Sequence, residues 1–274
     1  MGKSSGGAGR WLSIGGVVFQ PSEMVKIAII IFMARSLSFN RKHIKDFNKG
    51  VLPHLLVLSV VFLLILGQPD LGTAVVIAAT IYLLLAVAGA RISHLLALLF
   101  LGIGFLIAAI YAEPYRLKRL TAYLNPYEDP IGAGFQSIQS TLALGSGGLF
   151  GMGLGNSGQK FLYIPERHTD FIYAILGEEL GFLGAGFILI LFVILAWRGF
   201  KIAAAAPDQF ASLLAAGITI MITMQAVLNI GVVTGVFPVT GITLPFISYG
   251  GSSLVFTLAA VGVLLNISRY ANSK

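Results

Sequence analysis

Apolar stretches long enough to cross a bilayer recur along the whole chain, and they constrain its fold more than any other feature. A transmembrane helix needs about 20 mostly apolar residues. The sequence contains seven candidates, near residues 22–38, 51–66, 71–89, 93–112, 171–197, 208–230 and 250–268. It therefore predicts an all-α integral membrane protein that forms a single polytopic membrane domain over residues 1–274.

The composition excludes several classes of protein. Hydrophobic residues make up 57% of the chain and charged residues 11%, which is too apolar for a soluble domain. The chain has no cysteine, so disulfides, thiolate nucleophiles and cysteine-based metal sites are excluded. The net charge of +7 is distributed in a way that favours contact with anionic membrane lipids and not with nucleic acid.

Basic residues orient the predicted spans. If the spans alternate in direction, four basic segments fall on one side, which the positive-inside rule makes cytoplasmic. These segments are 39–50, 90–92, 198–207 and the C-terminal tail. The other side then receives residues 1–21, the turn 67–70, the long segment 113–170 and the uncharged loop 231–249. We therefore expect one large extracellular loop, over 113–170.

The large outer loop has two unusual features. Arg116, Lys118 and Arg119 carry positive charge on the outer side, where they either extend to lipid phosphates or hold an anionic substrate group. The run 145–155 is dense in glycine, but no Lys-Ser/Thr pair follows and no strand-turn-helix unit frames it. We expect this run to allow a close approach of backbones and not to bind a nucleotide.

A charged cluster ends the same loop, directly before an apolar helix. Glu166, Arg167, His168 and Asp170 lie within five positions. Asp170 could cap the following helix by accepting hydrogen bonds from its free N–H groups. It could equally act as a general base at the water–membrane boundary, because the positive helix end favours the ionised carboxylate. The two roles are compatible.

Further carboxylates lie within or beside the spans. Glu178 and Glu179 are buried in the bilayer if a straight span starts at 171, and one of them would then face a hydrated cavity. Alternatively, 171–179 forms an interfacial turn and the span starts near Leu180. Glu23 and Lys26, three residues apart, predict either an ordinary ion pair on one helix or the polar wall of a cavity.

Two outer segments have simpler interpretations. Asp70 follows Gln68-Pro69 and is expected to cap a helix in a tight turn. Arg10, next to Trp11, is typical of an interface anchor, although it could reach a phosphate. The loop 231–249 carries glycine and proline but no charge, so we expect it to fold back into the helix bundle and close a cavity.

Together these segments resemble the SEDS family (shape, elongation, division and sporulation) of bacterial membrane proteins, which includes FtsW, RodA and SpoVE. The resemblance covers nearly the whole chain in order. Matching segments are 9–12 (GRWL), 19–23 (FQPSE), 68–73 (QPDLGT), 125–126 (NP), 145–149 (GSGGL), 165–171 (PERHTDF), 178–181 (EELG) and 244–252 (LPFISYGGS). The segment 159–163 and the run 250–253 are closer to the FtsW and SpoVE branch.

The resemblance implies a ten-helix fold at the bacterial cytoplasmic membrane, of which seven helices are present here, so we expect three more before Met1. It implies a glycosyltransferase that polymerises the peptidoglycan precursor lipid II on the outer face, for division, sporulation or cell shape. The expected partner is a class B penicillin-binding protein, the transpeptidase. No cofactor is certain, and Mg or Mn is the candidate cation.

The resemblance also implies roles for individual residues. Asp170 matches the family's proposed catalytic aspartate, which would deprotonate the 4-hydroxyl of the acceptor sugar. The candidate substrate-binding residues are Arg10, Glu23, Lys26, Asp70, Arg116, Arg119, Lys160, Arg167, His168, Glu178 and Glu179. Two alternatives stay open: a lipid II flippase, and a non-catalytic scaffold that activates its penicillin-binding partner. A flippase is expected to show internal repeats and polar residues at the midplane, and the sequence shows neither.

Overall fold

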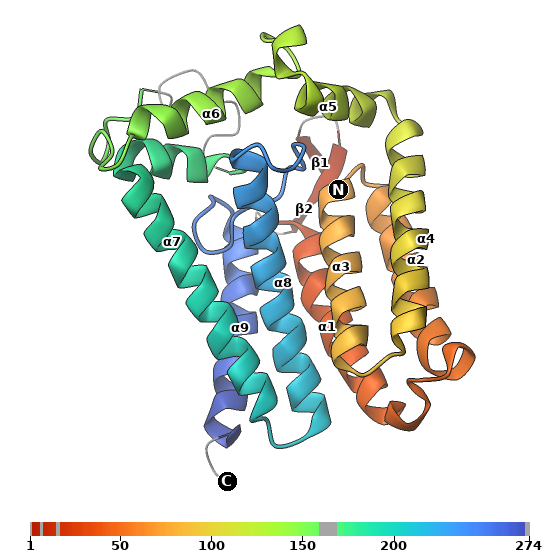
Figure 1. The fold of residues 1–274 in the computed structure, drawn as a ribbon. Helices are drawn as coiled ribbons and strands as arrows, with labels where there is room; N and C mark the ends of the chain where they lie inside the picture. The colour runs from red at the N-terminus through yellow and green to blue at the C-terminus, as the bar shows by residue number, and fades with distance from the viewer. Residues whose placement is uncertain (1, 6–7, 15–16, 159–168, 272–274) are drawn as a thin grey trace. The chain divides into compact units, whose positions relative to one another are not determined.

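The computed structural model describes residues 2–5, 8–14, 17–158 and 169–271, which are nearly all helical (Figure 1). The α-helices of this part are α1 (Pro21–Phe39), α2 (Leu52–Leu66), α3 (Leu71–Val87), α4 (Ile92–Tyr111), α5 (Pro114–Leu124), α6 (Phe135–Gly147), α7 (Ile172–Ala204), α8 (Gln209–Val233) and α9 (Gly251–Ala271). Shorter turns of helix are η1 (Arg41–His43), η2 (Phe47–Val51) and η3 (Pro126–Glu128). Helices occupy all seven of the predicted apolar stretches, and the all-α fold class is confirmed.

Several of these helices are suited to a membrane. Within the described residues, five helical segments are long and apolar enough to cross a bilayer: Phe47–Leu66, Ile92–Tyr111, Ile172–Ala204, Gln209–Val233 and Gly251–Ala271. Helix α3 is apolar but has only 17 residues, and α1 contains Glu23, Lys26 and Arg35. The chain is therefore a multi-pass membrane protein, while the count of seven crossings stays a prediction.

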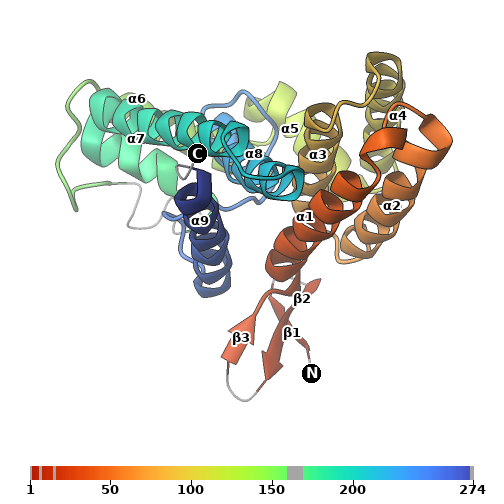
Figure 2. The same ribbon diagram turned by 90° about the horizontal axis from the view of Figure 1, so that it is seen from below.

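A small antiparallel sheet precedes α1, and the sequence did not predict it. Its strands are β1 (Gly2–Ser5), β2 (Ala8–Ile14) and β3 (Val17–Phe19), in the order β1-β2-β3. Gly2 pairs with Leu12, and Leu12 pairs with Phe19. The strands follow one another at the N-terminal end of α1 (Figure 2). The strands are short, and β1 contains no apolar side chain, so the usual alternation of apolar and polar residues is weak there.

The chain divides into two compact units. Unit 1 contains Met1–Ala97, Ile194–Met224 and Gly250–Lys274, and unit 2 contains Leu98–Val193 and Gln225–Tyr249. The core of unit 1 includes Ile30, Leu84 and Ile218, each at most 1% exposed. A Cβ atom added to Gly217 of α8 would lie 2.6 Å from Ile30 Cγ2 and 3.6 Å from a Leu84 methyl group. This glycine therefore lets α8 pack closely against α1 and α3.

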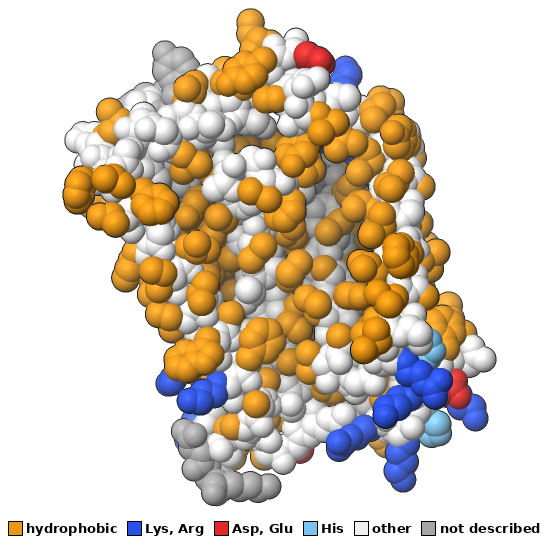
Figure 3. All heavy atoms as spheres, viewed as in Figure 1, with side chains coloured by type: hydrophobic (Ala, Val, Ile, Leu, Met, Phe, Trp, Pro, Cys, Tyr) orange, Lys and Arg blue, Asp and Glu red, His pale blue; other side chains and the backbone are white. Residues whose placement is uncertain are grey.

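Basic residues gather at one end of unit 1. The α1–α2 connection, the α3–α4 turn, the α7–α8 connection and the end of α9 all lie at this end (Figure 1). The exposed Arg41, Lys42, Lys45 and Lys49 belong to the first of these links, and Figure 3 shows the resulting concentration of Lys and Arg. Such clustering is what the positive-inside rule requires of links that share one membrane face.

Candidate functional site

Asp170 of unit 2 lies in a turn just before α7. Helix α7 begins at Ile172, which places Asp170 one residue outside the N-cap position predicted for it. Phe171, only 1% exposed, anchors the turn in the core, and Ala174 N donates to Phe171 O at 3.0 Å. Asp170 is itself half-buried, so it lies at the margin of the packed interior.

Two polar side chains hold the backbone on either side of this position. Asn229 of α8 donates from Nδ2 to Asp170 O at 2.7 Å and to Ile242 O at 2.7 Å. Ser248 Oγ donates to Thr169 O at 2.5 Å and accepts from Leu244 N at 2.7 Å. The residues around Asp170 are thereby joined to the loop that connects α8 and α9. Ile242 and Leu244 are buried, which confirms that this uncharged loop folds back onto the protein, while the cavity that it was expected to close stays a prediction.

The carboxylate of Asp170 faces the same loop. A Cβ atom added to Gly241 would lie 3.6 Å from Asp170 Oδ2. Gly241 has a φ of 76°, a left-handed conformation that side chains other than glycine rarely adopt. Glycine at this position therefore lets the backbone turn sharply beside the carboxylate.

Helix α5 fixes the other end of that loop. Arg119 Nη1 donates to Val239 O at 3.0 Å, and Tyr123 Oη donates to Val236 O at 2.9 Å. The Arg119 guanidinium also lies 4.5 Å from the centre of the Tyr115 ring, a favourable cation–π geometry. Arg116 Nη1 donates to Ala109 O at 2.8 Å, where it satisfies a carbonyl near the end of α4. Anion binding by Arg116 and Arg119 stays a prediction.

Glu178 is surrounded by protein donors. It is 3% exposed and accepts hydrogen bonds from Ser157 Oγ, from Gly158 N at 3.2 Å and from Ser146 Oγ at 3.4 Å. These partners belong to α6 and to the segment that follows it. The structure thus supplies the partners that a buried carboxylate needs, and the expected substrate contact of Glu178 stays a prediction.

A break in α7 separates Glu178 and Glu179 from the rest of that helix. Gly181 has φ 69° and ψ −171°, so the helix stops there and starts again. The glycine-rich segment after α6 satisfies the exposed backbone groups on both sides of the break. Met152 N and Gly153 N donate to Glu178 O and Glu179 O, each at 3.0 Å, while Phe182 N donates to Gly148 O at 2.8 Å. The predicted close backbone approach is confirmed, and the break at Gly181 shows that α7 is not one straight helix from its first residue. The interfacial position of residues 171–179, with the span starting near Leu180, stays a prediction.

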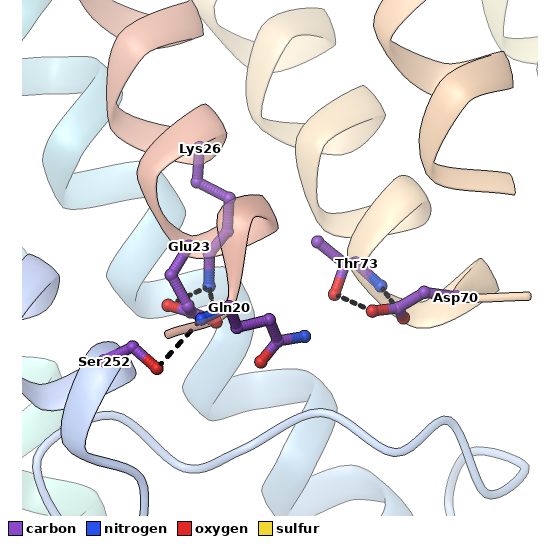
Figure 4. Close-up of polar contacts among 6 residues, drawn as sticks. All are labelled: Gln20, Glu23, Lys26, Asp70, Thr73 and Ser252. Atoms are coloured by element: carbon purple, nitrogen blue, oxygen red, sulfur yellow. Dashed lines mark hydrogen bonds and ion pairs between the residues drawn. The ribbon is translucent and has the colours of Figure 1, made fainter. Parts of the chain in front are cut away.

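A second group of predicted residues lies in unit 1. Lys26 Nζ is 2.9 Å from Glu23 Oε2, in an ion pair whose side chains are 4% and 7% exposed. Asp70 caps α3 as predicted, accepting from Thr73 N at 3.0 Å and from Thr73 Oγ1 at 2.9 Å. Figure 4 shows the ion pair in the first turns of α1 and Asp70 at the start of α3. Their predicted place in a cavity wall stays untested.

The N-terminal ends of α1 and α9 are also linked in unit 1. Gln20 N donates to Ser252 Oγ at 3.4 Å (Figure 4). Polar groups of three helices in this unit, α1, α3 and α9, are therefore concentrated at their N-terminal ends. The positive ends of helix dipoles favour negative charge there.

Some predicted residues lie beyond what the structure describes. Lys160, Arg167 and His168 fall outside the described residues. Arg10 belongs to β2, and its side chain is likewise not described. Among the residues that are described, no three His, Asp or Glu side chains form a group that could hold a metal ion. The expected cation, Mg or Mn, stays a prediction.

Sequence reasoning missed the residues that hold Asp170 in place. Gly241 and Ser248 lie in the outer loop 231–249, and Asn229 lies in the apolar helix before that loop. One signal was available for Asn229, because an amide within an apolar helix must find hydrogen-bond partners. Nothing in the sequence indicated that these partners would be the carbonyls of Asp170 and Ile242.

Comparison with known proteins places the chain among cell cycle proteins. The family model FTSW_RODA_SPOVE, described as "Cell cycle protein", matches residues 1–273. Stage V sporulation protein E of Bacillus subtilis (strain 168) is 55% identical over 97% of this chain and 72% of its own length. The probable peptidoglycan glycosyltransferase FtsW of Geobacter sp. (strain M18) is 45% identical over 98% of this chain and 73% of its own length.

Solved structures share the fold. A chain from a peptidoglycan synthase complex that coordinates polymerization and crosslinking has a TM-score of 0.80 and 38% identity, covering 100% of this chain and 76% of that one. Thermus thermophilus RodA, a rod shape determining protein, has a TM-score of 0.69 and 33% identity over 100% of this chain and 73% of its own. The chain belongs to the FtsW/RodA/SpoVE family of cell cycle proteins.

Proposed function

We propose that this chain is a peptidoglycan glycosyltransferase that polymerises lipid II at the outer face of the cytoplasmic membrane, with Asp170 as the general base. The glycosyltransferase assignment follows from relatives of that name that align over more than two thirds of their length. The observation that carries the residue assignment is the position of Asp170. A half-buried carboxylate at the start of a membrane helix has its backbone held by Asn229 and Ser248.

The reaction needs one proton acceptor. The 4-hydroxyl oxygen of the acceptor sugar attacks the anomeric carbon of the donor and forms the new glycosidic bond. The bond from that carbon to the diphosphate oxygen breaks, and undecaprenyl diphosphate leaves with the electron pair. Asp170 receives the hydroxyl proton. Attack opposite the leaving group inverts the configuration at the anomeric carbon.

The departing diphosphate carries negative charge that the protein must stabilise. Our candidates are Lys26, Arg116 and Arg119, together with Arg10 and Arg167. A divalent cation, Mg or Mn, would serve the same purpose by binding the diphosphate oxygens.

A class B penicillin-binding protein is the partner that we propose. Support comes from the similarity to a chain of a peptidoglycan synthase complex, whose two activities are polymerization and crosslinking. A glycosyltransferase would supply the polymerization, and a transpeptidase would crosslink the strands that it produces.

Purified protein given labelled lipid II tests this function. We expect glycan strands from the complex of the chain with a penicillin-binding partner whose transpeptidase serine has been removed. The partner alone should make none. Strand synthesis by the partner alone would favour the scaffold function. Transfer of lipid II across liposome membranes without polymerisation would favour the flippase.

A further inference from the structure

Asn229 and Ser248 donate hydrogen bonds to the backbone carbonyls of Asp170 and Thr169. We infer that Asn229 and Ser248 are positioning residues that fix the Asp170 carboxylate relative to the α8–α9 loop. This inference rests on the proposed role of Asp170 as the base. It concerns how that carboxylate is held and not which reaction it serves.

The first observation is that the two side chains hold adjacent backbone carbonyls. Ser248 Oγ donates to Thr169 O and Asn229 Nδ2 donates to Asp170 O. Two consecutive peptide groups are therefore held from two different parts of the chain, one in α8 and one in the loop. Fixing both groups limits rotation of the Asp170 backbone, which in turn fixes the direction of its Cα–Cβ bond.

The second observation is that each of these side chains also holds the α8–α9 loop. Asn229 Nδ2 donates to Ile242 O at 2.7 Å, and Ser248 Oγ accepts from Leu244 N at 2.7 Å. Gly241, beside the Asp170 carboxylate, directly precedes Ile242. Asn229 and Ser248 thus fix the position of the Asp170 carboxylate and the position of the loop backbone that this carboxylate faces.

The third observation is burial. Asn229 is 1% exposed, and it lies in an apolar helix where an amide side chain is costly unless it serves a purpose. A leucine would fill this position in α8 without that cost, so the amide is explained by its two carbonyl partners. A catalytic base must be held within a fraction of an ångström of its productive position, and small displacements reduce rates strongly.

The test uses Ser248→Ala and Asn229→Ala in the full complex with its partner, with lipid II as substrate. We expect kcat to fall about 10- to 100-fold in each, with KM for lipid II changed by less than about threefold. Thr234→Val is the control, because Thr234 is exposed just after α8 and its Oγ1 donates to Ile230 O at 2.8 Å and to Gly231 O at 3.3 Å, and not to the residues around Asp170. Its kcat should equal that of the wild type.

The decisive measurement combines Ser248→Ala with Asp170→Asn. If Ser248 acts through the carboxylate, the double variant will be no slower than Asp170→Asn alone. The inference is overturned if the fold loss of kcat in the double variant equals the product of the losses in the two single variants. It is also overturned if Ser248→Ala has a normal kcat. A normal rate in Asp170→Asn alone would instead refute the base. Ser248, which is less buried than Asn229, decides the question if Asn229→Ala fails to fold.

Discussion

Glu178 and the Glu23–Lys26 pair show how residues predicted to bind substrate are held by the protein itself. Glu178 accepts hydrogen bonds from Ser157, Gly158 and Ser146, and Lys26 is paired with Glu23. Each arrangement satisfies a charge that would otherwise be costly to bury. At the residue scale, these contacts predict effects on stability that can be separated from effects on catalysis.

Replacing Glu178 by alanine should destabilise the protein. The change leaves the buried Ser157 hydroxyl and the Gly158 N–H without this acceptor, which costs about 1–3 kcal/mol. Thermal unfolding in detergent measures the loss. Glu128→Ala is the control, because Glu128 is exposed and accepts a hydrogen bond from Asn125 Nδ2 at the surface. An unchanged melting temperature with a raised KM would show that Glu178 serves the substrate instead.

Replacing Glu23 by glutamine should destabilise unit 1 through Lys26. The ammonium group stays buried but loses its counter-charge, and breaking such a pair costs about 3–5 kcal/mol. The double variant Glu23→Gln/Lys26→Met removes both charges and should recover most of the stability. Denaturation of the single and double variants measures this recovery. Equal losses in both would contradict the account.

Sequence spacing predicted the local contacts of these residues but not the distant ones. The three-residue spacing of Glu23 and Lys26 predicted their pairing, and the position of Asp70 predicted a cap, because both contacts lie within one helical turn. Asn229 and Asp170 are 59 positions apart. Only tertiary packing brings them together, so single-sequence reasoning had no pattern from which to predict the contact.

At the scale of elements, the break in α7 is the feature that most depends on glycine. Gly181 has φ 69° and ψ −171°, a region that is essentially restricted to glycine. A Cβ atom there would lie 2.6 Å from Leu149 O. The glycine density of segment 145–155 predicted a close backbone approach. It could not indicate that the approach would be to a break in the following helix.

Gly181→Ala should therefore strongly lower stability. The left-handed strain alone costs about 1–3 kcal/mol, and the clash with the segment after α6 adds to it. Melting temperature and yield in detergent report the effect. Gly186→Ala in the same helix is the control, since its added Cβ atom has no neighbour within 4 Å and alanine favours a helix. A Gly181→Ala protein as stable as Gly186→Ala would contradict the described break.

For the whole molecule, orientation in the membrane decides whether Asp170 can meet lipid II. The apolar stretches predicted the helices of the fold, because the thickness of the bilayer sets the length of a membrane-spanning helix. The positive-inside rule predicts the membrane side, and the basic residues gathered at one end of unit 1 are what that rule requires of a cytoplasmic end (Figure 3). The chain has no cysteine, so single cysteines can report the side directly.

Cysteines at two exposed positions test that orientation. Tyr127, between α5 and α6, should react with a membrane-impermeant maleimide on intact cells when replaced by cysteine. Lys42, in the basic link, should react only after the membrane is permeabilised. Protein abundance on a blot controls for expression. The opposite labelling pattern would place Asp170 on the cytoplasmic side and exclude the proposed reaction.

The most direct test of the account is the rate at which Asp170→Asn polymerises lipid II in the purified complex at saturating substrate. Asparagine keeps the shape of the side chain but cannot accept the hydroxyl proton. We predict a fall of about 100-fold or more in kcat, with an unchanged melting temperature. A kcat within about threefold of the wild type would contradict the assignment of Asp170 as the base.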